Sequence, residues 1–437
     1  PYISKMGFDV LYLPPIHPIG TTKRKGKNNA ETAQPGDVGS PWAIGSYHGG
    51  HTAIEPALGT FDDFRKLVVS ATELGLEIAI DLAFQCSPDH PWVSEHPEWF
   101  RQRPDGTIQY AENPPKKYQD IYPIDFETES WRSLWQALLD VVLFWAGQDI
   151  RIFRVDNPHT KAFPFWEWMI DSVRQQFPDA IFLAEAFTRP KVMGRLAKLG
   201  FAQSYTYFTW RNTKEELTQY LTELTASPSR EYFRPNLWPN TPDILPEYLQ
   251  LGGRAGFMIR IGLAATLGAS YGIYGPAFEL CHSEPRTSGS EEYLNSEKYE
   301  IQSPDLGSAW SLRDYIARIN AIRKENLALQ ESWNLQFHEI DNPLMICYSK
   351  VTADGANVIV VVVNLDSGHG QAGWTNLDLP SLRIESGVPY QAHDLLGGGR
   401  YLWNGPRNYV ELSVLQPLHV LQLRRKSRTE RDFDYYL

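Results

Sequence analysis

The chain has 437 residues and 42% of them are hydrophobic, so it can bury a sizeable core and is too long for one ordinary domain. Its formal net charge of −11 argues against a general nucleic-acid or anionic-membrane surface, so any phosphate that it binds must meet a local basic site. No apolar run reaches the roughly 18 residues that span a bilayer, and no signal peptide opens the chain. The three cysteines are widely spaced and show no metal-ligand spacing, which predicts reduced thiols. Together with the missing membrane and signal segments, this predicts a cytoplasmic location.

Apolar strands alternate with helices through the first 330 residues, a pattern typical of parallel strands joined by crossover helices. The predicted strands lie at residues 8–13, 77–84, 151–156, 181–187, 201–208, around 236 and at 270–274. The predicted helices lie at residues 61–74, 130–146, 163–177, 190–199, 213–224, 254–267 and 309–325. This gives seven strands, and residues 2–6 read as the end of a helix. We therefore expect an N-terminally truncated (β/α)8 TIM barrel whose first strand lies upstream of Pro1.

Two stretches depart from this alternation. Residues 85–126 are rich in proline, aromatic residues and charge without a sustained period, and long excursions of this kind are commonly functional. From about residue 334 the pattern changes to short strands, among them the almost purely β-branched residues 357–364, divided by turn clusters such as Gly397-Gly-Gly399. We predict a catalytic barrel in residues 1–330 and a C-terminal antiparallel β-sandwich in residues 331–437.

Three acidic residues lie at or just past the C-terminal ends of predicted strands. Alternate side chains of a strand share a face, so Arg154 and Asp156 point the same way, towards the catalytic rim of a barrel. Asp156 could instead cap the following helix. Glu185 stands in Phe-Leu-Ala-Glu-Ala-Phe, where apolar neighbours raise the pKa of a buried carboxyl, whereas Arg154 favours the Asp156 anion. With Asp243, the set indicates glycoside chemistry, which needs a general acid and a nucleophile.

In that order and on those strands, Arg154-x-Asp156, Glu185 and Asp243 resemble the signature regions of the α-amylase clan of glycoside hydrolases and transglycosylases. The resemblance implies that Asp156 is the nucleophile and Glu185 the general acid/base. It also implies that Asp243 orients sugar hydroxyls and stabilises the transition state.

The chain departs from the usual clan pattern at two places. It has Gln85-Cys86 where hydrolases usually have Asn-His, and Pro242-Asp243 where they usually have His-Asp. Because the lost Asn puts the amylase calcium site in doubt, we predict no structural metal, and we predict no cofactor. The departures match one branch, the α-1,4-glucan:maltose-1-phosphate maltosyltransferases. Stretches that resemble this family's signatures are Pro14-Pro-Ile-His-Pro-Ile-Gly20, Arg24-Lys-Gly-Lys-Asn-Asn29, Gln85-Cys-Ser-Pro-Asp-His-Pro-Trp92, Asn113-Pro-Pro-Lys-Lys-Tyr-Gln-Asp-Ile-Tyr122 and Asn157-Pro-His159.

A phosphorylated donor fits the residues in these stretches. Lys25 and Lys116, with Asn113, Tyr118 and Asn157 as neutral donors, could surround a phosphate, although residues 23–27 alone would read as a solvated basic loop. The resemblance implies maltosyl-phosphate binding by Lys25, Gln85, Asp120 and Asn157, distal-glucose binding by Lys298 and Tyr299, and a place for Arg154 in the same substrate-binding set.

The resemblance implies a retaining glycosyltransferase that moves a maltosyl unit from α-maltose 1-phosphate to the non-reducing end of an α-1,4-glucan such as glycogen. It also implies a homodimer in the full-length protein. The alternatives are an α-glucan hydrolase, a trehalose-forming isomerase of the same clan, or an inactive glycogen-binding fragment. His90 and His159 could assist in the pocket, but histidines satisfied within the structure are the favoured interpretation.

Overall fold

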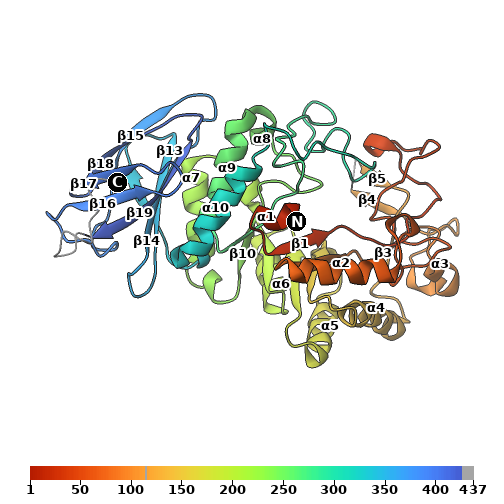
Figure 1. The fold of residues 1–437 in the computed structure, drawn as a ribbon. Coiled ribbons are helices and arrows are strands. Elements are labelled where there is room, and N and C mark those ends of the chain that lie inside the picture. Colours follow the sequence, from red (N-terminus) through yellow and green to blue (C-terminus); the bar gives the residue numbers. More distant parts are fainter. Residues whose placement is uncertain (114–115, 426–437) are drawn as a thin grey trace. The chain divides into compact units, whose positions relative to one another are not determined.

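Residues 1–113 and 116–425 are described by the structure, a computed structural model (Figure 1). They fall into two compact units, each of which is described by itself. The first unit holds Pro1–Tyr205 and Leu294–Pro304, and the second holds Thr206–Tyr293 and the residues from Asp305 onward. The domain boundary expected between residues 330 and 331 stays a prediction. None of the helices in the described residues is long and apolar enough to cross a membrane.

The first unit contains a parallel sheet of five strands that neighbour one another in chain order. The strands are β1 (Val10–Leu13), β2 (Glu77–Leu82), β7 (Ile152–Asp156), β8 (Ile181–Glu185) and β9 (Gln203–Tyr205). The register sets Asp81 beside Arg154, and Asp156 beside Glu185. The alternation of strand and helix predicted for this part of the chain is confirmed.

Helix α1 (Tyr2–Lys5) precedes β1, and longer helices join the strands. They are α2 (Phe61–Glu73), α4 (Trp131–Ala146), α5 (Phe163–Gln176) and α6 (Pro190–Lys198). A capping box fixes the start of α2, because the Thr60 hydroxyl accepts from the Asp63 N–H and the Asp63 carboxylate accepts from the Thr60 N–H. Helices α4 and α5 pack side by side, with the Trp135 and Phe165 rings 5.4 Å apart (Figure 1).

The two faces of the parallel sheet differ in polarity. Alternate residues such as Ile80, Phe153 and Phe182 join the helices in one buried hydrophobic core. The residues between them point to the opposite face and are largely polar: Tyr12, Asp81, Arg154, Asp156, Glu185 and Tyr205. The strand ends therefore gather ionisable groups on the face away from the helices.

The predicted excursion at residues 85–126 consists of short elements. They are β3 (Gln85–Cys86), α3 (Pro91–Glu95), β4 (Ala111–Asn113), β5 (Lys116–Tyr118) and β6 (Tyr122–Pro123). Strand β3 pairs with β6 and β4 pairs with β5, in both cases antiparallel. Pro114 and Pro115, between β4 and β5, lie outside the described residues, as do the side chains of Asn113 and Lys116.

The second unit combines helices with two kinds of sheet. Its helices are α7 (Lys214–Thr225), α8 (Glu247–Leu251), α9 (Gly253–Leu267) and α10 (Arg313–Glu325). A short parallel pair joins β10 (Pro235–Leu237) to β11 (Ser270–Tyr271). These elements match the helices predicted at residues 213–224, 254–267 and 309–325.

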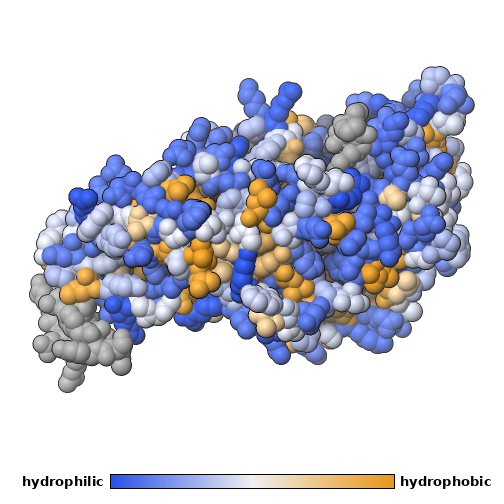
Figure 2. All heavy atoms as spheres, turned by 90° about the horizontal axis from the view of Figure 1, so that it is seen from above, coloured by the Kyte–Doolittle hydropathy of each residue, from blue (hydrophilic) through white to orange (hydrophobic). Residues whose placement is uncertain are grey.

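Eight antiparallel strands follow, in the spatial order β17-β16-β19-β14-β13-β12-β15-β18. They are β12 (Leu335–Ile340), β13 (Met345–Val351), β14 (Val358–Asn364), β15 (Gln371–Asn376), β16 (Tyr390–Asp394), β17 (Arg400–Trp403), β18 (Arg407–Leu412) and β19 (Leu418–Arg425). The start of β12 pairs with β13, whereas Glu339 and Ile340 pair with β15, so β12 turns the corner between two layers. The predicted antiparallel sandwich is confirmed. On the face seen in Figure 2, hydrophobic side chains lie in small groups between hydrophilic ones.

Lys350 is an exception to the apolar interior of this unit. Its side chain is fully buried on β13, and Nζ donates to the Leu267 carbonyl at the end of α9 over 3.4 Å. Burial, reinforced by the nearby Arg323 cation and opposed by Glu331, lowers the pKa of Lys350 to about 7. Burying this amine therefore lowers the free energy of unfolding at pH 7.

We predict that Lys350→Met stabilises the protein at pH 7 by on the order of 3 kcal/mol, because methionine fills the site without a buried charge. The wild type should gain stability as pH rises from about 7 towards 10.5, since deprotonation then no longer has to be driven by folding. Urea unfolding at pH 7 and pH 10 measures both effects. The exposed Lys191→Met is the control, and an equal response of the two variants would contradict the prediction.

Candidate active site

Arg154 is the centre of the polar face of the parallel sheet. Its side chain is 2% exposed and contacts three carboxylates. Nη1 donates to Asp81 Oδ2 over 2.8 Å and to Asp156 Oδ1 over 3.0 Å, and Nη2 pairs with Glu185 Oε1 at 2.6 Å. Burial opposes the guanidinium charge, but the carboxylates outweigh it and raise the pKa of Arg154. One cation thus holds three acids at neighbouring strand ends.

Two tyrosines enclose this cluster. The Tyr12 hydroxyl donates to Asp81 Oδ2 over 2.5 Å, and the rings of Tyr12 and Tyr205 lie 5.7 and 5.8 Å from the Arg154 guanidinium carbon. Burial, opposed by Arg154 and reinforced by Asp156, raises the pKa of Asp81 to about 6. Burial also raises the pKa of both tyrosines, so they stay neutral hydrogen-bonding groups at pH 7.

Asp156 is held as an anion. Burial opposes its ionisation, but Arg154, Lys161 and a hydrogen bond with the Glu185 side chain together lower the pKa of Asp156 below its ordinary value. A hydrogen bond between two carboxyl groups needs a proton on one of them. This bond favours the Asp156 anion. The pair therefore combines a carboxylate held as an anion with a second carboxyl group beside it, the two groups that a nucleophile and a general acid require.

The expectation that Glu185 lies among apolar side chains is wrong. Its sequence neighbours Ala184 and Ala186 are buried and apolar, but its carboxyl group is paired with Arg154 at 2.6 Å. Alternation along a strand explains the difference, because flanking residues point away from the face that carries Glu185.

Lys161 and Asn157 close the C-terminal end of β7. Lys161 Nζ donates to the backbone carbonyls of Asp156 and Asn157, both over 3.2 Å. Burial lowers the pKa of Lys161, and the Asp156, Glu185 and Asp81 carboxylates oppose that shift. Asn157 adopts a left-handed backbone, with φ 43° and ψ 54°, which asparagine tolerates better than most residues. Its side chain is exposed.

Lys25 is the buried member of the basic loop. It is 5% exposed, whereas the side chain of Lys27 is 65% exposed and pairs with Glu300 at 3.2 Å. Lys25 Nζ donates to the Lys117 carbonyl over 3.3 Å. The alternative of a purely solvated loop at residues 23–27 is therefore wrong for Lys25.

Asp120 and Lys298 connect Lys25 to the carboxylate cluster. Asp120 is 2% exposed and its Oδ1 atom has no hydrogen-bond partner in the described residues. Burial raises the pKa of Asp120, opposed by the charges of Lys25 and Lys298. Lys298 also lowers the pKa of Asp156, so its ammonium group acts on both carboxylates. The predicted residues Lys25, Asp120 and Lys298 are thus brought to one region with Asp156.

Gln85, Trp42 and Tyr118 form a wall beside these charges. Gln85 Nε2 donates to the Trp42 carbonyl over 3.1 Å, and Lys298 Nζ lies 5.1 Å from the centre of the Trp42 ring. Tyr118 packs against the small hydrophobic cluster that contains Trp42. The Tyr299 ring centre is 5.8 Å from Lys298 Nζ. An aromatic ring and an amide beside a cation form a surface suited to a sugar phosphate.

Three predicted site residues are not placed with this group. The side chains of Asn113 and Lys116 lie outside the described residues. Asp243 belongs to the second unit, where its N–H donates to the Thr241 hydroxyl over 3.2 Å within a tight turn. That turn is anchored by Asn240, whose Nδ2 donates to the Tyr274 carbonyl and the Tyr293 hydroxyl. The catalytic role of Asp243 stays a prediction.

Besides Trp42 in the wall, the sequence analysis did not select four residues that the structure places in the site. Asp81, Tyr12 and Tyr205 occupy inward positions of their strands, so strand alternation at the ends of β1, β2 and β9 was the available signal. Lys161, five residues after Asp156, carried no pattern that would separate it from a surface lysine.

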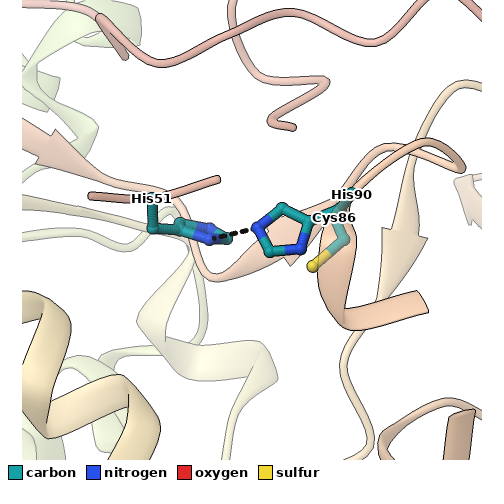
Figure 3. Close-up of side chains that lie close together, drawn as sticks. All are labelled: His51, Cys86 and His90. Atoms are coloured by element: carbon teal, nitrogen blue, oxygen red, sulfur yellow. Dashed lines mark hydrogen bonds between the residues drawn. The ribbon is translucent and has the colours of Figure 1, made fainter. Parts of the chain in front are cut away.

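In the described residues, one cluster has side chains close enough to share a metal ion: His51, Cys86 and His90 (Figure 3). Their potential metal-binding atoms all lie within 4.8 Å of one another. The Trp92 N–H donates to His90 Nδ1 over 3.0 Å, so His90 carries its proton on Nε2 and donates to His51 Nδ1 over 3.0 Å. His51 Nε2–H then donates to the Ala83 carbonyl over 3.0 Å. These bonds engage every nitrogen of both rings, so the arrangement does not suit a metal ion.

The two histidines singled out by sequence differ. His90 is satisfied within the structure, as expected. For His159 the expectation is wrong, because its Nδ1 atom is buried without a hydrogen-bond partner in the described residues.

Comparison with known sequences finds relatives that match nearly the whole chain. A family profile described as "GLGE, C-terminal" matches residues 337–423. An α-1,4-glucan:maltose-1-phosphate maltosyltransferase of Chlorobaculum tepidum is 57% identical over 434 residues, or 98% of this chain and 65% of the relative. A protein of the same name from Methylacidiphilum infernorum is 53% identical over 424 residues, or 97% and 63%. The chain thus spans less than two thirds of the length of these relatives.

Comparison with solved structures finds α-amylases. A maltogenic α-amylase of Thermotoga neapolitana matches with a TM-score of 0.74 at 18% identity, covering 96% of this chain and 91% of that one. An α-amylase of Lactobacillus plantarum matches with a TM-score of 0.71 at 21% identity, covering 96% and 92%. Identities this low show the fold alone. They confirm the predicted α/β barrel class with a C-terminal antiparallel β domain.

We predict that Asp81→Asn changes the pH dependence of stability. Between its ordinary pKa of 3.8 and the folded value of about 6, Asp81 binds more protons folded than unfolded, so its contribution to stability falls as pH rises through that window. The stability of wild type relative to Asp81→Asn should therefore drop by about 2 kcal/mol from pH 4 to pH 6.5. Guanidinium unfolding across this range measures it, with the exposed Asp62→Asn as control. A difference that stays constant or grows with pH would overturn the assignment.

Proposed function

This chain belongs to the family of α-1,4-glucan:maltose-1-phosphate maltosyltransferases, and from that premise we propose that the protein containing it is a retaining glycosyltransferase. It transfers a maltosyl unit from α-maltose 1-phosphate to the non-reducing end of an α-1,4-glucan and releases phosphate. The observation that carries the proposal is the arrangement of Asp156 and Glu185 on neighbouring strand ends around Arg154.

The first half-reaction uses both carboxyl groups. The Asp156 carboxylate attacks the anomeric carbon of the donor while the bond from that carbon to the phosphate oxygen breaks. Glu185 gives its proton to the departing phosphate, and a maltosyl ester of Asp156 with inverted configuration remains. Arg154 favours this step twice, since it keeps Asp156 ionised beforehand and lies 2.6 Å from the carboxylate that Glu185 becomes.

The second half-reaction restores the configuration. The Glu185 carboxylate takes the proton of the acceptor 4-hydroxyl, whose oxygen attacks the anomeric carbon and displaces Asp156. Two inversions give an α-linkage in the product. Asp243 is proposed to orient sugar hydroxyls in both steps.

Lys25 and Lys298 are proposed to attract the donor phosphate, with Lys116, Asn113, Tyr118 and Asn157 as further donors. The support is that Lys25 is buried against the excursion at Lys117, and that Lys298 acts on both Asp120 and Asp156. Gln85, Asp120 and Tyr299 are proposed to bind sugar hydroxyls beside them. A homodimer and a cytoplasmic location stay predictions.

Phosphate release from α-maltose 1-phosphate, with and without glycogen, tests the reaction on the full-length protein. We expect release that depends on glycogen, and a loss of on the order of 10³-fold or more in Asp156→Asn because the nucleophile is gone. Asp171→Asn removes an exposed carboxylate of α5 and should leave the rate unchanged. Equal release without glycogen would indicate a hydrolase, and undiminished turnover by Asp156→Asn would remove it from the mechanism.

Glu185→Gln separates the two roles of Glu185. With α-maltose 1-phosphate it should lose about 10²–10⁴-fold in rate, because the acid and base are both missing. With α-maltosyl fluoride, whose leaving group needs little protonation, the first step should proceed and the second should stall. Intact-mass and peptide analysis should then find a maltosyl adduct on Asp156. An adduct elsewhere, or no adduct with the fluoride donor, would contradict these roles.

A further inference from the structure

The hydrogen-bonded histidine pair joins two segments that line the candidate active site. We propose that His51 and His90 are positioning residues: their relay fixes the wall formed by Trp42 and Gln85, so that donor binding depends on it more than the chemical step does. The statement about donor binding rests on the proposed function, whereas the placement of the wall does not.

The relay has a fixed direction. Its three hydrogen bonds run from the Trp92 N–H to His90, from His90 to His51, and from His51 to the Ala83 carbonyl. A second proton on either ring would place two N–H groups face to face and break one bond. The relay therefore requires both rings to be neutral and each to hold its proton on Nε2.

The surroundings keep both rings neutral. Burial lowers the pKa of His51 from its ordinary range, and it lowers that of His90 to about 3 and that of His17 to about 4. The titratable groups that face the pair are His17, whose Nδ1 donates to the Ala53 carbonyl, and the buried thiol of Cys86. Burial raises the pKa of Cys86, so the thiol adds no charge at pH 7.

Packing leaves the rings little freedom. A Cβ atom on Gly50 would lie 2.2 Å from His90 Nε2, and one on Gly45 would lie 2.4 Å from His90 Cδ2. The His51 ring stacks on Trp92 with centres 5.1 Å apart and planes 21° apart. The His90 ring therefore lies close against the backbone of residues 45–50, and Trp92 limits the movement of the His51 ring.

The same two segments form the wall of the site. Gln85, two residues after Ala83, donates through Nε2 to the Trp42 carbonyl, and Ser87 Oγ donates to the Gly45 carbonyl over 2.6 Å. Trp42 in turn lies against Lys298 Nζ, which acts on Asp156 and Asp120. The relay is thus connected to the groups proposed to bind the donor through the contact of Gln85 with Trp42 and that of Trp42 with Lys298.

Three substitutions test the relay. His51→Phe keeps a ring against Trp92 but removes both polar links. His51→Gln keeps one acceptor and one donor, and cannot titrate. His90→Asn keeps the cap on the Trp92 N–H, because asparagine is a good N-cap residue, but is too short to reach His51. The exposed His48→Asn, on the same segment, is the matched control.

Steady-state phosphate release by the full-length protein gives the first result. We expect KM for α-maltose 1-phosphate to rise about tenfold in His51→Phe and His90→Asn with kcat changed less than about threefold, and both constants to be near wild type in His51→Gln and His48→Asn. An unchanged KM in both disrupting variants, or a loss confined to kcat, would overturn the proposal.

Two measurements decide the positioning role without activity. In ¹⁵N-histidine spectra of the wild type, both rings should be neutral Nε2–H tautomers at pH 7. Hydrogen exchange of peptides spanning residues 42–50 and 83–90 should speed up at least tenfold in His51→Phe and His90→Asn, and not in His51→Gln. A wild type without phosphate release would defeat the proposed function alone, whereas a different tautomer or unchanged exchange would defeat the positioning role.

Discussion

The buried guanidinium of Arg154 is the interaction on which the site depends. Three carboxyl groups within 3.0 Å of one cation would repel one another without it, and their strands meet in the register that brings them together. The hydrophobic core on the opposite face of the sheet makes that register rigid. Arg154 therefore sets the geometry of Asp156 and Glu185 and favours the Asp156 anion.

Part of the geometry of the site could be predicted from the alternation of side chains along a strand. The pattern of residues 151–156 places Arg154 and Asp156 on one face, and the structure confirms the contact. The β-branched residues 357–364 likewise became β14, a central strand of the antiparallel sheet. In both cases the information lies within a few neighbouring residues, where period and composition decide the conformation.

Contacts between distant segments were not predictable in the same way. Asp81 meets Arg154 through strand register, and Lys298 acts on Asp156 from more than a hundred residues away. The environment of Glu185 was misjudged for this reason, because its partner comes from another strand. His51 was missed entirely, since its relay depends on loop segments whose approach is set by glycines at 45 and 50.

The local balance of charge is compatible with the anionic donor that we propose, even though the formal net charge of the chain is −11. The linked groups comprise four bases and four acids: Lys25, Arg154, Lys161 and Lys298, and Asp81, Asp120, Asp156 and Glu185. Burial raises the pKa of Asp81 and Asp120, whereas Arg154 and Lys161 lower the pKa of Asp156 against the effect of burial. Cations therefore balance the acids locally, and in the proposed mechanism the carboxylate that Glu185 becomes lies beside Arg154, a cation already in place.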